Sequence, residues 1–111
     1  MKTIKTLASF EAIVTNYRYV VVILSSDSCP DCHYLDTFTD ALEMAHNDIV
    51  FVKVKRSDLP MLFTHYNVYG VPSIFFYENA ELTDTYIDKN RKTLSMVDAF
   101  ITQAKKGGNP Q

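Results

Sequence analysis

Residues 19–32 read YVVVILSSDSCPDC, and this stretch decides the fold of the chain. It begins with a continuous apolar run rich in β-branched residues, which is typical of a strand buried on both faces of a sheet. Polar residues follow, and then Cys29 and Cys32, the only cysteines, open a segment with helical periodicity. The stretch therefore predicts a buried strand, a short loop and a helix that begins at the cysteines.

The elements around this stretch can be read from capping residues and apolar spacing. Residues 1–6 suit a short first strand, and Ser9 suits the cap of a helix that follows it. The apolar run itself predicts a strand over residues 19–25. After the cysteines, one continuous helix is expected to run as far as His46, and its apolar face consists of Leu35, Phe38, Leu42 and Ala45.

The second half of the chain alternates in the same way. It predicts a strand over residues 49–55 and a short helix that starts around Asp58 and Pro60 and ends near Asn67. Residues 73–77 and 83–87 suit two strands joined as a hairpin through residues 78–81. A final helix is expected to present one apolar face, made of Leu94, Val97, Phe100, Ile101 and Ala104.

This alternation of strands and helices indicates an α/β fold. We expect a central mixed sheet of about five strands, with parallel crossovers and one antiparallel edge, flanked by helices. The chain has 111 residues, of which 47% are hydrophobic, so it can bury one core but not two. We therefore assign residues 1–106 to a single domain and residues 107–111 to a flexible tail.

Composition and charge exclude several classes of function. The formal net charge is −2 and the basic residues are scattered among acidic ones, so the chain lacks the basic stripe of a nucleic-acid-binding protein. We see no membrane-spanning segment and no secretory signal in the sequence, so we expect a soluble, cytoplasmic protein. We also expect it to be a monomer. A mature exported domain would have the same composition. In a reducing compartment, a pair of cysteines is more often catalytic or metal-binding than structural.

The motif Cys29-Pro30-Asp31-Cys32, together with Gly70-Val71-Pro72, resembles the thioredoxin family over nearly the whole chain. The resemblance implies a thioredoxin-like fold in which Pro72 follows a cis peptide bond and lies against the active-site disulfide. It also implies that Val71 presents backbone groups to an incoming peptide.

The spacing of the cysteines predicts reversible disulfide exchange. At the start of a helix, free N–H groups stabilise negative charge, so Cys29 is expected to be the attacking thiolate. Cys32, one turn further on and deeper inside, would resolve the mixed disulfide. Pro30 stiffens the helix start, whereas the negative charge of Asp31 opposes thiolate formation. We therefore expect a reducing rather than an oxidising pair.

Three positions bear on a closer assignment within the family. Ile23 stands where the family commonly has a buried acid, and Ser28 stands where it commonly has tryptophan. Without that acid, the resolving thiol lacks a proton acceptor. Lys53 matches a lysine that lies near the acid, so here it needs another partner or helps to lower the pKa of Cys32. These departures point away from a general-purpose thioredoxin. The Cys-Pro-Asp-Cys motif also occurs in a thioredoxin-related subgroup with a narrow substrate range, which the resemblance therefore implies here.

Other residues admit a simpler interpretation beside a functional one. The string that ends at His33 also matches a haem-attachment signature, but haem attachment belongs to exported proteins, and an exposed histidine is the simpler interpretation. Zinc would need more ligands than the neighbourhood offers, so we expect no metal and no cofactor. Asp27 suits a solvated loop acid better than a proton carrier. Tyr66 and Tyr69 flank the approach to Pro72, and either can shape a peptide-contact surface.

Two classes of function remain. In the first, the chain is an enzyme that reduces protein or small-molecule disulfides through Cys29 and Cys32 and is itself reduced by an enzyme such as a thioredoxin reductase. In the second, it is a binding module that holds peptides or a partner on the Pro72 face and turns over poorly. The presence of both cysteines together with Pro72 favours the enzyme.

Overall fold

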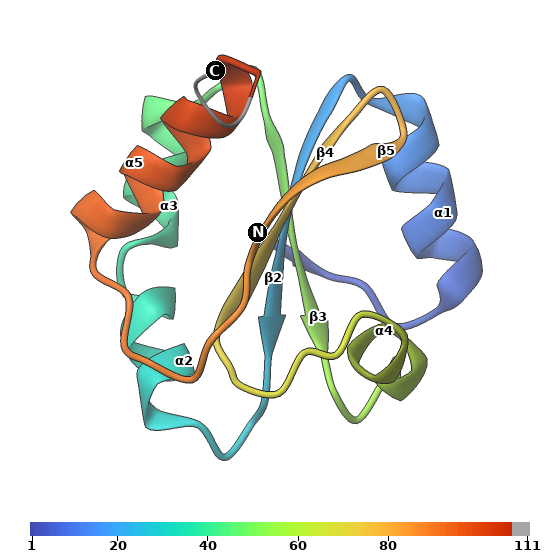
Figure 1. The fold of residues 1–111 in the computed structure, drawn as a ribbon, viewed down its shortest axis with the longest axis vertical. Coiled ribbons are helices and arrows are strands. Elements are labelled where there is room, and N and C mark those ends of the chain that lie inside the picture. The colour runs from blue at the N-terminus through green and yellow to red at the C-terminus, as the bar shows by residue number, and fades with distance from the viewer. Residues whose placement is uncertain (108–111) are drawn as a thin grey trace.

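A computed structural model describes residues 1–107 of the chain, and Figure 1 shows its fold. Of the predicted tail, residues 108–111 lie outside the described residues. The elements in chain order are β1 (Lys2–Thr3), α1 (Leu7–Asn16), β2 (Tyr19–Ser25), α2 (Pro30–Asp36), α3 (Thr39–Ala45), β3 (Val50–Lys55), α4 (Pro60–His65), β4 (Ser73–Glu78), β5 (Glu81–Tyr86) and α5 (Leu94–Lys105).

The strands form one five-stranded mixed sheet in the order β1-β3-β2-β4-β5. Strand β3 pairs in parallel with β1 and β2, whereas β4 pairs antiparallel with both β2 and β5. The predicted α/β fold with a mixed sheet is therefore confirmed. The antiparallel part extends further than the predicted edge, because β4 also runs against the central strand β2.

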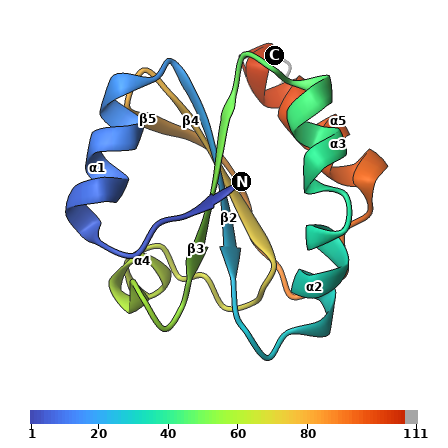
Figure 2. The same cartoon turned by 180° about the vertical axis from the view of Figure 1, so that it is seen from behind.

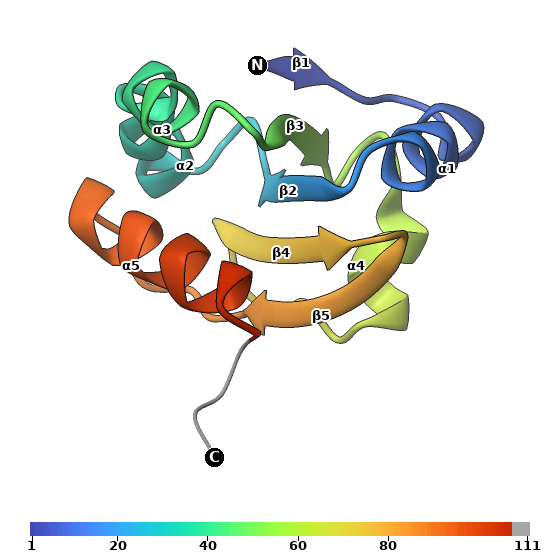
Figure 3. The same cartoon turned by 90° about the horizontal axis from the view of Figure 1, so that it is seen from above.

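Helices cover both faces of the sheet. Helices α1 and α4 lie on one face, and α2, α3 and α5 lie on the other, as Figure 3 shows from above and Figure 2 from behind. The central strand β2 supplies both cores: Val20, Val22 and Leu24 face the first, and Val21 and Ile23 face the second. The continuous apolar run is therefore explained by burial on both faces.

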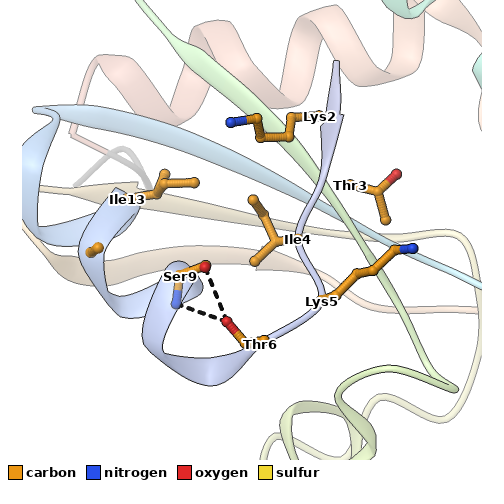
Figure 4. A pocket seen from close by; sticks show the side chains of 8 residues that line it. Lys2, Thr3, Ile4, Lys5, Thr6, Ser9 and Ile13 are labelled. Carbon is orange, nitrogen blue, oxygen red and sulfur yellow. Dashed lines mark hydrogen bonds between the residues drawn. The ribbon is translucent and has the colours of Figure 1, made fainter.

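The first helix begins earlier than predicted. Thr6, not Ser9, is its N-cap, because the Thr6 side chain accepts a hydrogen bond from the Ser9 backbone N–H at 3.2 Å. Figure 4 shows this contact at the edge of a pocket of about 440 Å³ between the β1 segment and α1. None of the residues predicted to form the functional site lines this pocket.

The helix predicted to run on to His46 is two helices. After α2, the Thr37 hydroxyl donates to Tyr34 O at 2.6 Å, and Phe38 leaves the helical conformation with φ −125° and ψ 12°. Threonine hydroxyls that bond to nearby carbonyls offer the backbone an alternative to the helix, which accounts for the break. Leu42 is still buried, but Ala45, which was predicted on the same buried face, is exposed.

The remaining boundaries shift by a few residues. The hairpin turn is shorter than predicted, since Asn79 and Ala80 alone connect β4 and β5, both with positive φ as in a type I′ turn. Helix α4 ends at His65 rather than near Asn67, and it begins after Leu59 without a side-chain cap. Leu94 is the first residue of α5 and is exposed, although it was predicted on the apolar face. No helix among residues 1–107 is long and apolar enough to cross a membrane.

Candidate active site

The two cysteines lie at the junction of β2 and α2, as predicted. Cys29 is the N-cap of α2, and its Sγ accepts a hydrogen bond from the Cys32 backbone N–H at 3.1 Å. Pro30 is the first helical residue, where its fixed φ suits the helix and its missing N–H costs nothing. Both thiols are free, and Cys29 is half-buried whereas Cys32 is buried. The more accessible thiol is therefore the one at the helix start.

Burial sets the protonation of the inner thiol. Cys32 is only 2% exposed, and desolvation, followed by its contact with Cys29, raises the pKa of Cys32 to about 11. A hydrogen bond involving Ser25 acts in the opposite direction but does not offset the burial. At neutral pH, Cys32 is therefore a protonated thiol behind a more exposed sulfur.

The segment that contains Pro72 lies against the outer thiol. The Val71–Pro72 peptide bond is cis, as the family resemblance implies, and Pro72 is buried. Val71 O lies 3.6 Å from Cys29 Sγ, although the two residues are 42 positions apart in the sequence. Val71 itself is half-buried. The structure therefore brings together Cys29, Cys32, Val71 and Pro72.

Lys53 forms an ion pair with a residue other than the buried acid of the family, which is replaced by Ile23 in this chain. Its Cα is paired with that of Ile23 across β2 and β3, where the aliphatic side chain is only 1% exposed. The Lys53 ammonium instead forms an ion pair with Asp36 at 2.8 Å. Lys53 is not among the groups that shift the pKa of Cys32, which is raised mainly by burial.

Asp31 is paired with a residue that the sequence did not indicate. The Arg91 Nε donates to Asp31 Oδ1 at 3.1 Å, and the Arg91 guanidinium stacks on the Tyr34 ring with its Cζ 4.0 Å from the ring centroid. These residues are 60 positions apart, and Arg91 follows β5 in an irregular segment, so no sequence periodicity links them. The negative charge expected beside the cysteines is thus balanced by a cation.

The remaining candidates make local contacts. Asp27 forms an ion pair with Lys55 at 3.0 Å and remains 72% exposed, which agrees with a solvated loop acid. His33 is exposed, and its Nε2 lies 2.7 Å from Asp27 O. Tyr66 packs edge-on against Phe75 with the ring centroids 5.3 Å apart. Among residues 1–107, no cluster of three or more metal-ligating side chains is present.

Comparison with known proteins gives one consistent result. The family model described as thioredoxin matches residues 2–102. The chain is 28% identical to the thioredoxin of Gallus gallus over 96 residues, which covers 85% of this chain and 91% of that protein. It is 29% identical to Thioredoxin H5 of Oryza sativa subsp. japonica over 86 residues, which covers 78% of this chain and 64% of that protein.

Solved structures share the fold. The solution structure of oxidised thioredoxin from Plasmodium falciparum superimposes with a TM-score of 0.80 and covers 94% of this chain and 97% of its own. The two sequences are 20% identical, so this likeness concerns the fold alone. The five-stranded sheet flanked by helices is the fold shared with these proteins.

Proposed function

The chain belongs to the thioredoxin family of thiol-disulfide oxidoreductases, and from this premise we propose that it reduces disulfides through Cys29 and Cys32. The observation that carries the proposal is the pairing of an accessible Cys29 Sγ at the start of α2 with the protonated Cys32 behind it. Protein or small-molecule disulfides are the proposed substrates.

The exchange proceeds in two balanced steps. The Cys29 thiolate attacks one sulfur of the substrate disulfide, a Cys29–substrate disulfide forms, and the other substrate sulfur leaves as a thiolate that takes a proton from water. Cys32 then gives its proton to water and attacks the Cys29 sulfur. The bond between Cys29 and the substrate breaks, and the second substrate sulfur leaves as a thiolate that takes a proton from water. The substrate gains two electrons, and the two cysteines lose them as their disulfide forms.

The environment of Cys32 keeps this residue in its thiol form. A thiol whose pKa is raised to about 11 is costly to ionise. At neutral pH, the reduced pair therefore gains no stability from a Cys32 thiolate, unlike a strongly oxidising pair, whose reduced form is stabilised. The negative charge of Asp31, from which the motif predicted the reducing direction, is balanced by Arg91 and does not add to this argument.

We assign the substrate-contact role to the segment at Val71 and Pro72. Val71 is half-buried, and its carbonyl oxygen lies beside Cys29. In our proposal this oxygen accepts a hydrogen bond from the backbone of an extended peptide. The oxidised pair would be restored by a dithiol donor such as a thioredoxin reductase. In this scheme the chain transfers electrons to disulfide substrates and so contributes to redox homeostasis. It acts as a cytoplasmic monomer and needs no cofactor.

A second candidate is a binding module with the same fold. It is favoured by Ile23, which is 1% exposed and occupies the position of the family's common acid, so that no carboxylate there accepts the Cys32 proton. Such a module would hold a peptide or partner on the Pro72 face and exchange disulfides slowly.

Covalent trapping tests the proposed function. With Cys32→Ser, the first step is retained and the second is lost, so the protein should accumulate a disulfide between Cys29 and a disulfide-containing peptide. Intact mass spectrometry should show one added peptide thiol that dithiothreitol removes. The matched control is the Cys29→Ser/Cys32→Ser double variant, which should add nothing. Equal labelling of the two variants would refute the assigned role of Cys29.

A further inference from the structure

The segment between β5 and α5, residues 87–93, is held in one conformation by buried contacts. It reaches the helix of the cysteines, where Arg91 contacts Asp31. Lys92 is fully buried, and its Nζ donates to Asp88 Oδ1 at 2.6 Å and to Asn90 O at 2.9 Å. A buried ammonium is tolerated only when acceptors surround it, so these contacts hold the segment in one shape. Arg91 immediately precedes this anchor.

The same segment is hydrogen-bonded to residues on both sides of Pro72. Tyr69 donates its hydroxyl to Ile87 O at 3.2 Å, and the Ser73 hydroxyl lies 3.4 Å from Asp88 O. The backbone of Lys89 lies so close to Gly70 that a Cβ there would come within 2.5 Å of it. The segment that carries Arg91 therefore has a defined position relative to the candidate active site.

We propose that Arg91 is a positioning residue of the redox centre, which holds and neutralises Asp31 so that the helix start stays favourable to the Cys29 thiolate. The proposal rests on the proposed function and deepens it. Asp31 lies between the two cysteines, and its side chain is 35% exposed, so its charge is only partly screened by water. The Arg91 guanidinium balances that charge, and its stacking on the Tyr34 ring holds its orientation.

Most of the other charged groups around the helix start have partners of their own. Asp27 is paired with Lys55, and Asp36 is paired with Lys53. His33 contacts the Asp27 backbone oxygen, and Lys89 is exposed on the same segment as Arg91. Two further titratable neighbours lie on α2: Tyr34, whose ring contacts the Arg91 guanidinium, and Cys32, which is protonated at neutral pH. The pair of Asp31 and Arg91 is therefore the contact whose disruption changes the charge on the residue that precedes Cys32.

The test is the pH dependence of iodoacetamide alkylation at Cys29, read by site-resolved mass spectrometry on the reduced protein. Arg91→Met should slow alkylation at pH 7 about two- to fivefold and move its midpoint to higher pH, because Asp31 is left unbalanced. Asp31→Asn should move the midpoint to lower pH. The double variant should return toward the wild type, and Arg91→Lys should retain most of the wild-type profile.

Arg18→Met is the matched control, because Arg18 also pairs with a carboxylate, Glu78, and lies over a tyrosine ring, Tyr19. This arrangement lies at the opposite end of β2, so the profile should not change. A wild-type profile for Arg91→Met, or shifts of the same sign for Arg91→Met and Asp31→Asn, would overturn the proposal. Alkylation needs no substrate turnover, so this outcome is distinguishable from failure of the proposed reductase activity.

Discussion

Cys29→Ser should lower the rate of disulfide reduction by at least about a hundredfold, as expected when a nucleophile is removed. The reason is that no second nucleophile can replace it. Cys32 is only 2% exposed, and burial raises its pKa to about 11, so at pH 7 its thiolate is scarce and shielded from a substrate. The measurement is dithiothreitol-driven reduction of insulin, followed by the turbidity of the released chains.

Cys32→Ser provides the comparison for this loss. It makes the same chemical change three residues further on, so it should also abolish turnover but leave the first exchange step intact. Only Cys29→Ser should lose both turnover and covalent trapping. If Cys29→Ser reduced insulin at the wild-type rate, the chain would be a binding module instead.

Gly70→Ala should destabilise the protein by about 1–3 kcal/mol, the usual cost of an added methyl group where there is no room for it. A Cβ at position 70 would lie 2.5 Å from both the N and the Cα of Lys89. These are backbone atoms, which cannot be moved aside as the end of a flexible side chain can. The substitution would therefore push the segment before α5 away from Pro72, and Arg91 would move with it.

Urea unfolding at equilibrium measures this change in the free energy of unfolding. Ala80→Gly is the matched control, because it removes one methyl group at a turn position where φ is +68°. It should be neutral or stabilise the protein by up to about 1 kcal/mol, because glycine adopts this φ without strain. Equal stability of Gly70→Ala and the wild type would show that the Lys89 segment does not pack closely against Gly70.

The parts of the fold that depend on local pattern could be predicted from the sequence. The run in β2 is continuous because alternate residues face two different cores, and the predicted strand agrees with the observed one. The break between α2 and α3 could not be seen in the periodicity. Leu35 and Leu42 are seven residues apart, so they fall on one face of a single helix and are equally buried in two shorter ones.

The parts of the site that depend on long-range contacts could not be predicted. Nothing in the sequence pattern around Lys92 indicates burial, yet it is buried because Asp88 and Asn90 supply acceptors for its ammonium. Arg91 meets Asp31 only because the sheet order brings the end of β5 to the start of α2. The motif of the cysteines indicated the chemistry, whereas the charge balance around it depends on the fold.

A redox titration of Cys29 and Cys32 tests most directly whether this chain is a reductant. The protein is equilibrated with reduced and oxidised dithiothreitol or glutathione, and the two forms are counted by trapping the free thiols. We expect one reversible two-electron transition, about 30 mV per tenfold change in the ratio, at a potential nearer to about −270 mV than to about −120 mV. A potential near about −120 mV, or no reversible disulfide between Cys29 and Cys32, would contradict it.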